Sequence, residues 1–288
     1  AARASSAVTV FCLFAHHRSA STWSSAIFRE LGASFGWRRA VIHDAAAPVA
    51  DPALSGSRFA ADFLVFSNAH PDILGALPAF RGVHLVRDPR DILVSSYFAH
   101  RFSHPTADWP ELAAHRRELE ALNEEDGLLL ELDCRRDQFS AMAAWPYGDE
   151  RVCEWRFEEV VERPVEHVER LLREWGMTVA PRAAALSPLP RAWNKLASRL
   201  EARQGSSLLP RWRSSRIASR QLEGIVRRHA FRAKSGGRRP GEDDPMHHYR
   251  SGVPGSWRQH FTPALRRRFR ERYGSLLVQL GYERTQEW

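Results

Sequence analysis

The segment at residues 80–100, FRGVHLVRDPRDILVSSYFAH, constrains the fold most strongly. Its apolar run at residues 83–86 is long enough for a buried strand and too short for a helix. Asp88 then suits a helix N-cap and Pro89 the first helical residue, so a helix is expected directly after the strand. With Arg87 at the strand's carboxyl end, this arrangement can bind an anion, because unpaired N–H groups and a fixed charge point the same way. An ordinary strand-to-helix turn with a surface arginine is equally compatible with these residues.

A second strand, loop and helix are predicted near the start of the chain. Residues 8–15 (VTVFCLFA) have the composition of a fully buried strand, and residues 22–31 have the apolar spacing of a helix that Gly32 ends. The loop between them, HHRSAS, is rich in small residues that let backbone N–H groups approach an anion. The chain has no GxxxxGK[ST] string, so this is not the loop of a nucleoside triphosphatase.

The charge of the chain favours anionic partners. Its formal net charge is +8, and Lys195 and Lys234 are its only lysines, so a cationic site has to use arginine. Nucleotides, sulfated or phosphorylated substrates, nucleic acid and acidic membranes all fit this balance. Three scattered cysteines do not make a disulfide framework or a CxxC metal site. No apolar run approaches the roughly 18 residues of a membrane span.

Four segments in order resemble motifs of one family. AHHRSASTW (residues 15–23) and VRDPRDILVSSY (residues 86–97) are similar to the two signatures of the sulfotransferases that use 3′-phosphoadenosine 5′-phosphosulfate (PAPS). HYRSGVPGSWRQHFTP (residues 248–263) resembles that family's closing R-K-G-x-x-G-D-W-x-x-x-F-T segment, and residues 156–177 resemble its R-Y-E-D-L helix pair. Each match alone is moderately specific, whereas the ordered set is strong.

The resemblance assigns roles to residues of this chain. It implies that the loop residues that cradle the 5′-phosphosulfate are Arg18, Ser19, Ala20, Ser21, Thr22 and Trp23. It implies that the 3′-phosphate is bound by Arg87 and Ser95, with Arg250, Ser251 and Gly252 closing over it. Arg18 at a helix N-terminus would neutralise charge on the bridging oxygen as the sulfuryl group leaves. Trp23 is expected either to contact the purine ring or to be an ordinary core residue.

The chain departs from the family pattern at several positions. Arg18 occupies the position of the common Lys, and Ala20 occupies the position of the usual Gly. Alanine adopts a positive φ less readily than glycine. Ser251 and Ser256 stand where Lys and Asp are frequent, so one charge fewer is available for the 3′-phosphate. Phe157 replaces a Tyr whose hydroxyl contacts adenine in some members, and remains a candidate cofactor-binding residue.

The general base is expected in the loop after the strand at residues 63–66. His70 in SNAHP falls where the family's K-T-H-x-P histidine lies, and a neutral imidazole accepts a hydroxyl proton near pH 7. A capping or core histidine is the structural alternative. The rivals for the base are His43 and Asp44, or a carboxylate within residues 111–131.

The expected fold is one α/β domain over residues 1–288, with a P-loop-like parallel sheet of about five strands and helices on both faces. Two polar-faced helices, at residues 107–123 and 127–147, lie in an acceptor insertion at about residues 102–150. A mobile lid is expected within residues 187–248, with the Gly- and Pro-rich residues 233–245 as its loop. The acidic run of residues 120–131 is interpreted as a solvated face, its members being Glu120, Glu124, Glu125, Asp126 and Glu131.

The resemblance implies direct in-line transfer of the sulfuryl group from PAPS, without a metal ion, leaving 3′-phosphoadenosine 5′-phosphate (PAP). The acceptor is a hydroxyl, or less favourably an amine, of a small molecule or a carbohydrate. A P-loop kinase or triphosphatase is one alternative. A nucleic-acid-binding protein is another, because it would explain the net charge and the basic residues 196–233. A cytoplasmic protein without nucleic acid or a membrane span is expected, and a targeting segment upstream is compatible with the sequence.

Overall fold

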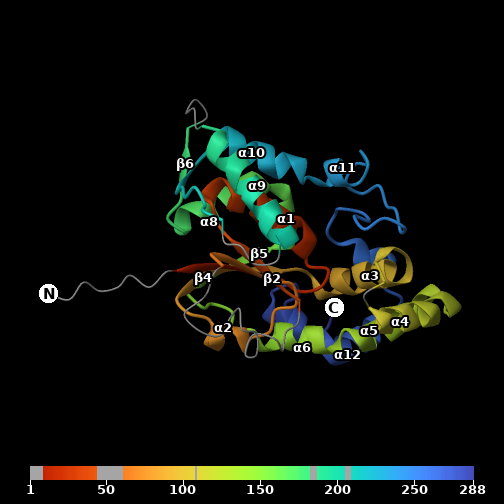
Figure 1. Ribbon diagram of the computed structural model, residues 1–288. Coiled ribbons are helices and arrows are strands. Elements are labelled where there is room, and N and C mark those ends of the chain that lie inside the picture. Colours follow the sequence, from red (N-terminus) through yellow and green to blue (C-terminus); the bar gives the residue numbers. More distant parts are fainter. Residues whose placement is uncertain (1–8, 44–60, 108, 182–186, 205–208) are drawn as a thin grey trace. The chain divides into compact units, whose positions relative to one another are not determined.

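The computed structural model describes residues 9–43, 61–107, 109–181, 187–204 and 209–288 (Figure 1). The chain forms two compact units, each built from several chain segments. Unit 1 comprises the described residues of Ala1–His16, Ala20–Leu85 and Tyr147–His229, and unit 2 those of His17–Ser19, Val86–Pro146 and Ala230–Trp288. The expectation of a single domain remains a prediction.

Unit 1 contains a five-stranded sheet in the order β2-β3-β1-β4-β5. Its strands are β1 (Val10–Phe14), β2 (Arg39–Ile42), β3 (Phe63–Phe66), β4 (Phe80–Val86) and β5 (Val152–Arg156). The pairs β1–β3, β1–β4 and β2–β3 are parallel. The predicted α/β class and the sheet of about five strands are confirmed, and the predicted strand at residues 63–66 has the observed bounds. The strand predicted at residues 83–86 begins earlier, at Phe80.

Alternate residues of the strands build the core of unit 1. Phe11, Leu13, Phe63 and Val83 belong to one apolar cluster, because side chains two positions apart share a face of a sheet. Three helices supply its other members: α1 (Ser21–Phe35), α8 (Pro164–Glu174) and α10 (Ser219–Arg228). Figure 1 shows α1, α8 and α10 together on one side of the sheet, with α9 (Leu189–Gln204) beside α1. On the opposite strand face, the rings of Phe14 and Phe66 stack at 5.3 Å.

The remaining elements of unit 1 are short. They are α2 (Ile73–Ala76), α7 (Phe157–Glu162), and the parallel pair β6 (Thr178–Ala180) and β7 (Arg216–Ala218).

Helix α1 is longer than the sequence predicts. It continues past Gly32 and ends at Phe35, and the left-handed residue that follows it is Gly36, at φ 76°. A Cβ atom at Gly36 would come within 2.4 Å of the carbonyl oxygen of Trp212, so both conformation and space require glycine there. The prediction that Gly32 ends this helix was therefore wrong.

Unit 2 is helical. The predicted helix start after Asp88 is confirmed: α3 (Pro89–Phe98) begins there, and the Asp88 side chain accepts a hydrogen bond from the backbone N–H of Arg90. A π-helical segment, η2 (Ala99–Ser103), continues α3. Further along, the chain forms α4 (Pro110–Ala121), α5 (Glu124–Cys134), α6 (Arg136–Ala144), α11 (Phe231–Lys234), η3 (Ser256–Gln259) and α12 (Pro263–Gln279).

The predicted insertion helices differ from the observed ones. Two helices were expected in residues 107–147, and the described residues of this range form three, because the second predicted helix is divided at Arg135. Asn123 caps α5, its side chain accepting from the N–H of Asp126. Glu131, interpreted as part of a solvated acidic face, is instead fully buried. Sequence spacing alone does not distinguish a buried acid with partners from a solvated one.

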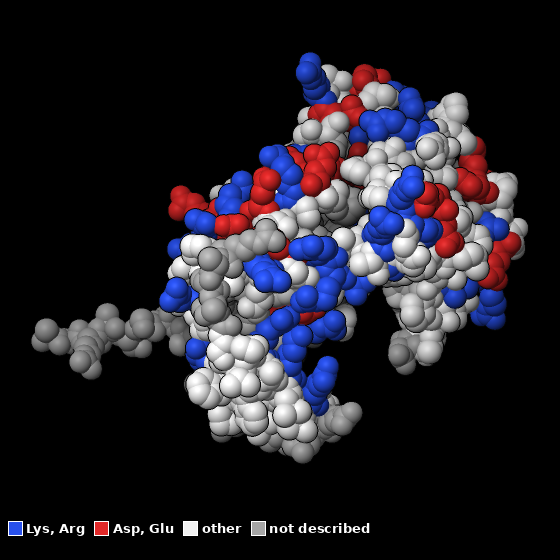
Figure 2. Space-filling view, turned by 90° about the horizontal axis from the view of Figure 1, so that it is seen from above, with Lys and Arg blue, Asp and Glu red and all other residues white. Residues whose placement is uncertain are grey.

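Three arginines of the basic stretch at residues 196–233 form ion pairs within unit 1. Arg213 lies 2.7 Å from Asp62, and Arg228 lies 2.6 Å from Glu30. Arg211 pairs with Glu201. Basic side chains are nevertheless prominent on the face that Figure 2 shows. Within the described residues, no helix combines the length and the apolar character needed to cross a membrane.

Candidate anion-binding site

The strand order explains why separate loops lie at one edge of the sheet. β1 is flanked by β3 and β4, and all three are parallel, so the chain leaves them at the same edge. The polar loops that begin at His16 and at Ser67 follow β1 and β3, and Arg87 follows β4. The N–H of Ala69 donates to the carbonyl of Ala15 at 2.8 Å, which holds the first two loops together.

Unit 2 brings together Arg18, Arg87 and Ser95, which the sequence assigned to one ligand. Nε of Arg18 donates to Oγ of Ser95 at 3.0 Å, and Nη1 of Arg87 donates to the carbonyl of Arg18 at 2.8 Å. The other side of the Arg18 guanidinium faces His248, whose carbonyl accepts from Nη2 at 3.0 Å. Arg87 and Ser95 are buried, at 9% and 6% exposure. Residues 77 positions apart in sequence therefore form one polar cluster.

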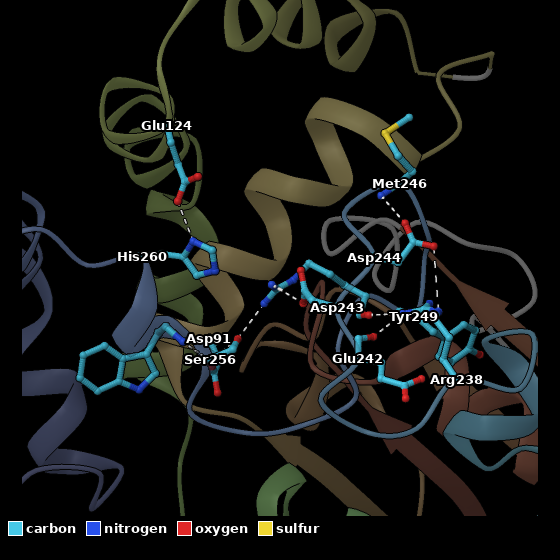
Figure 3. A network of polar contacts seen from close by, with 12 residues as sticks. Asp91, Glu124, Arg238, Glu242, Asp243, Asp244, Met246, Tyr249, Ser256 and His260 are labelled. Carbon is cyan, nitrogen blue, oxygen red and sulfur yellow. Dashed lines mark hydrogen bonds and ion pairs between the residues drawn. The ribbon is translucent and has the colours of Figure 1, made fainter.

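Arg250 joins this cluster from the C-terminal part of the chain. Its guanidinium lies 4.7 Å above the ring of Phe98 and donates to Oγ of Ser256 at 2.7 Å. One acidic partner, Asp243, lies 2.7 Å from its Nη1. Arg250 is 7% exposed. Figure 3 shows Asp243 and Ser256 with the polar contacts of the surrounding loop.

The three guanidinium groups are close enough to repel one another. Burial, together with the positive charges of Arg87 and Arg250, lowers the pKa of Arg18 to about 10. Burial and Arg18 also lower the pKa of His248 to about 4, so this imidazole is neutral at pH 7. Arginines gathered in this way are stabilised by an anion that neutralises the excess charge.

Two internal contacts fix the loop that carries Arg250. Asp91, fully buried in α3, accepts hydrogen bonds from the backbone N–H groups of Gly255 at 2.6 Å and Trp257 at 3.0 Å. Arg238 donates to the carbonyls of Tyr249 and Arg250, both at 2.6 Å. Residues 233–245, expected to form a mobile loop, thus contribute definite contacts to unit 2.

Ser251 and Gly252 have structural roles in the same loop. The carbonyl of Ser251 accepts from the N–H of Gly241 at 2.8 Å. Gly252 has φ 68°, and a Cβ atom there would come within 2.3 Å of the Phe231 ring. The glycine lets the backbone turn beside Phe231, whatever else it contacts.

The start of α1 in unit 1 carries the other predicted loop residues. Ala20 has φ 69° and ψ 23°, and no side chain among the described residues caps the helix. The first N–H groups of the helix belong to Ser21, Thr22 and Trp23 and have no carbonyl one turn earlier in the helix. Trp23 packs against the apolar core of unit 1, which favours its interpretation as a core residue. Ser19, the last residue before this segment, is fully buried.

Replacing Ala20 with Gly is expected to raise the free energy of unfolding by about 0.5–1 kcal/mol, because Ala pays for its left-handed conformation and Gly does not. Urea denaturation measures the effect. In the matched control, Ala26→Gly within α1, the glycine occupies a right-handed position and should lower stability by about 1 kcal/mol. Equal losses in both variants would contradict the prediction.

His70 and its rival His43 lie in neighbouring loops of unit 1. The His70 side chain is 40% exposed and lies 3.2 Å from the carboxylate of Asp72. His43 contacts Oγ of Ser67 through Nδ1 at 3.0 Å, and Asn68 donates to the His43 carbonyl at 2.8 Å. Both imidazoles thus follow neighbouring strands, β2 and β3. Asp44, the other rival, lies outside the described residues.

Phe157 begins α7, directly after β5, and is half-buried. It belongs to unit 1, as do Ala20–Trp23 and His70, whereas Arg18, Ser19, Arg87, Ser95 and Arg250–Gly252 belong to unit 2. Within unit 2, Arg18, Arg87, Ser95 and Arg250 therefore lie close together.

The sequence did not predict two carboxylate–histidine–histidine networks. In each of them a carboxylate contacts one histidine, and that histidine contacts a second one. In unit 1, Glu154 lies 2.6 Å from His84, whose Nε2 lies 2.9 Å from Nε2 of His16. Burial lowers the pKa of His84 to about 3. In unit 2, Glu131 contacts His100, which contacts His17. No local sequence pattern predicts these networks, because the residues in contact are 31 to 83 positions apart in the chain.

One comparison with known proteins gives a family match. A family model described as "Sulfotransferase family" matches residues 38–181, half of the chain. This region includes His70, Arg87, Ser95 and Phe157. No curated protein matches the sequence significantly.

Two similar solved structures are both complexes with PAP. The mouse sulfotransferase SULT7A1 complexed with PAP is 14% identical, with a TM-score of 0.49, over 95% of this chain and 86% of that one. Retinol dehydratase in complex with androsterone and the inactive cofactor PAP is 14% identical, with a TM-score of 0.45, over 93% of this chain and 80% of that one.

Proposed function

The chain belongs to the sulfotransferase family, and on that premise we propose that it transfers the sulfuryl group of PAPS to an acceptor. The acceptor is a hydroxyl, or less favourably an amine, of a small molecule or a glycan. The S–O bond to the bridging phosphate oxygen breaks, a bond to the acceptor oxygen forms, and PAP leaves with the phosphate charge. We propose that this transfer is direct and uses no metal ion.

The gathering of Arg18, Arg87 and Arg250 is the observation that carries the proposal. The donor has a phosphomonoester at its 3′ position and a phosphosulfate at its 5′ position, so it needs two anion sites. Arg87 and Ser95 suit the 3′-phosphate, because a bidentate guanidinium and a hydroxyl match its oxygens. Arg250, with Ser251 and Gly252 next in the chain, is proposed to hold the same group from the other loop. The depressed pKa of Arg18 supports an anion there.

The loop at residues 18–23 is proposed to hold the 5′-phosphosulfate. Arg18 would place positive charge at the bridging oxygen, where negative charge grows during transfer. The N–H groups of Ser21, Thr22 and Trp23 point from the helix start, where an anion is favoured. Ser19 and Ala20 set the path of the backbone into that helix, and Ala20 does so in the conformation that glycine usually takes.

His70 is proposed to accept the proton of the acceptor hydroxyl. Its exposed imidazole follows β3, and the carboxylate of Asp72 near Nδ1 would stabilise the imidazolium that forms. His43 remains the rival base in the neighbouring loop. Phe157 is proposed to lie at the adenine.

Binding of PAP distinguishes this function from its alternatives. The purified protein is titrated with PAP, 5′-AMP and Mg-ATP while its thermal unfolding is followed. PAP at about 100 times its Kd is expected to add about 2.7 kcal/mol to the free energy of unfolding, and the other two ligands much less. Arg87→Ala should remove the response. Arg81→Ala, at an exposed arginine of β4, the strand that precedes Arg87, should keep it.

A response to Mg-ATP without one to PAP would replace the proposal with a phosphoryl transferase. Binding of single-stranded or duplex nucleic acid that weakens steeply with salt, again without a PAP response, would favour the nucleic-acid alternative.

A further inference from the structure

A cluster of metal-ligating side chains lies inside unit 2, on three consecutive helical elements. His100 comes from η2, His115 from α4 and Glu131 from α5. Oε2 of Glu131 lies 3.0 Å from Nδ1 of His100 and 2.8 Å from Nε2 of His115. The three ligand atoms lie within 4.8 Å of one another. No second such group of histidine, cysteine and acidic residues occurs in the part of the chain that the structure describes.

We propose that His100, His115 and Glu131 form a binding site for a divalent transition-metal ion, Zn²⁺ in the first place. Two imidazole nitrogens and one carboxylate oxygen are a ligand set that zinc takes, with a water molecule as the fourth ligand. With bonds of about 2.0–2.1 Å, tetrahedral ligands lie about 3.3 Å apart. The two separations from Oε2 of Glu131, 3.0 and 2.8 Å, need to open by only a few tenths of an ångström.

Burial favours a built site over an accidental surface cluster. Glu131 is fully buried, His100 is 1% exposed, and the His115 side chain is 13% exposed. Magnesium and calcium prefer oxygen ligands, so two imidazoles among three ligands select against them. His100 also lies in a π-helical segment, a local distortion that often marks a functional position.

Every proposed ligand is held by a contact on its other side, as metal ligands usually are. Nε2 of His100 lies 3.0 Å from Nε2 of His17. Nδ1 of His115 lies 3.5 Å from Sγ of Cys134. Nε of Arg135 lies 2.9 Å from Oε1 of Glu131, although neither atom makes a well-aligned hydrogen bond. These outer contacts fix the rings so that Nδ1 of His100 and Nε2 of His115 both face Oε2.

The competing interpretation is a hydrogen-bond network in which both rings donate to Glu131. It uses the same separations and needs no ion, so the experiment must separate the two. If an ion is bound, it ties η2, α4 and α5 together. Through His100 it also fixes His17, the chain neighbour of Arg18. The ion takes no part in the transfer proposed above, and its binding can be measured without an activity assay.

The test begins with the wild-type protein, stripped with a chelator and titrated with ZnCl₂ in a calorimeter at pH 7.5. About one zinc ion per chain is expected, with a higher melting temperature, and MgCl₂ should have neither effect. Co²⁺ in the same site should show the visible absorption of a tetrahedral ion. The strong near-ultraviolet absorption of a Co²⁺–thiolate bond is not expected, because Cys134 contacts His115 rather than the ion.

Variants then locate the site. His115→Ala should abolish zinc binding, and Cys134→Ser should weaken it about tenfold while keeping the stoichiometry. The matched control is His260→Ala, since His260 pairs with Glu124 at 2.6 Å in the same unit but outside the cluster. It should bind zinc normally. If His115→Ala does not fold, the wild-type titration decides alone.

Absence of zinc binding to the stripped wild-type protein would overturn the proposal and leave the hydrogen-bond network. Undiminished binding by His115→Ala would place the ion elsewhere and would equally overturn it. Neither result bears on PAP binding, so this inference and the proposed function fail separately.

Discussion

Replacing Arg18 with Ala is expected to lower kcat about 10²- to 10³-fold at saturating PAPS, a loss of about 3–4 kcal/mol of transition-state stabilisation. The guanidinium is half-buried and lies among Ser95, His248 and the charges of Arg87 and Arg250. Removing it withdraws a fixed charge from the oxygen on which negative charge grows. The rate is measured with the best acceptor from a panel of phenols, alcohols and sugars.

Two controls separate catalysis from binding. Arg18→Lys returns the residue common at this position in the family and restores a point charge, so it should recover at least tenfold of the loss. PAP titration of Arg18→Ala should show weaker binding than wild type but clear saturation, because Arg87 and Arg250 remain. Retention of more than a tenth of the wild-type kcat by Arg18→Ala would refute the assigned role.

Replacing Arg90 with Ala is expected to lower the free energy of unfolding by about 3–5 kcal/mol. Arg90 is 2% exposed, and its guanidinium lies 3.9 Å from the ring centre of Trp257 and 4.5 Å from that of Trp288. It donates to Asp88 at 2.9 Å and to Glu283. The substitution leaves the buried Asp88 carboxylate without its cation and opens a cavity between the two tryptophans. Urea denaturation of the isolated variant gives the loss directly.

Arg258→Ala is the matched control for this prediction. Arg258 also stacks on Trp257, at 4.7 Å, but its side chain is exposed. Its removal should cost less than about 1 kcal/mol. Similar losses in the two variants would show that stacking on Trp257, and not the buried ion pair with Asp88, determines the effect.

Local sequence determined the elements that begin and end within a few residues. The strand at residues 63–66 follows from a short apolar run, and the start of α3 follows from Asp88 and Pro89. The positive φ of Ala20 was foreseeable because a glycine is usual at that position of the motif. In each case the cause lies in one or two adjacent residues, so no knowledge of distant segments is needed.

The end of α1 shows where local signals become ambiguous. Gly32 and Gly36 are both possible helix stops by sequence, and only the structure shows that the helix ends before Gly36, where a side chain would meet Trp212, 176 residues away in the chain. The motifs likewise identified Arg18, Arg87 and Arg250 as anion-binding candidates, but not the crowding that lowers the pKa of Arg18. That effect requires the three charges to be neighbours in space.

Only the tertiary structure decided which charged residues are buried and what they contact. Asp91 lies in the first turn of α3, and its buried carboxylate accepts hydrogen bonds from the backbone N–H groups of Gly255 and Trp257. Glu131 was expected in solvent, and it lies between His100 and His115. A carboxylate is stable both in water and in the interior among hydrogen-bond donors. The residues next to it in the sequence do not distinguish these two environments. The donors that contact Asp91 and Glu131 come from other segments of the chain. Tertiary packing therefore determines whether these carboxylates are buried, and the local sequence does not.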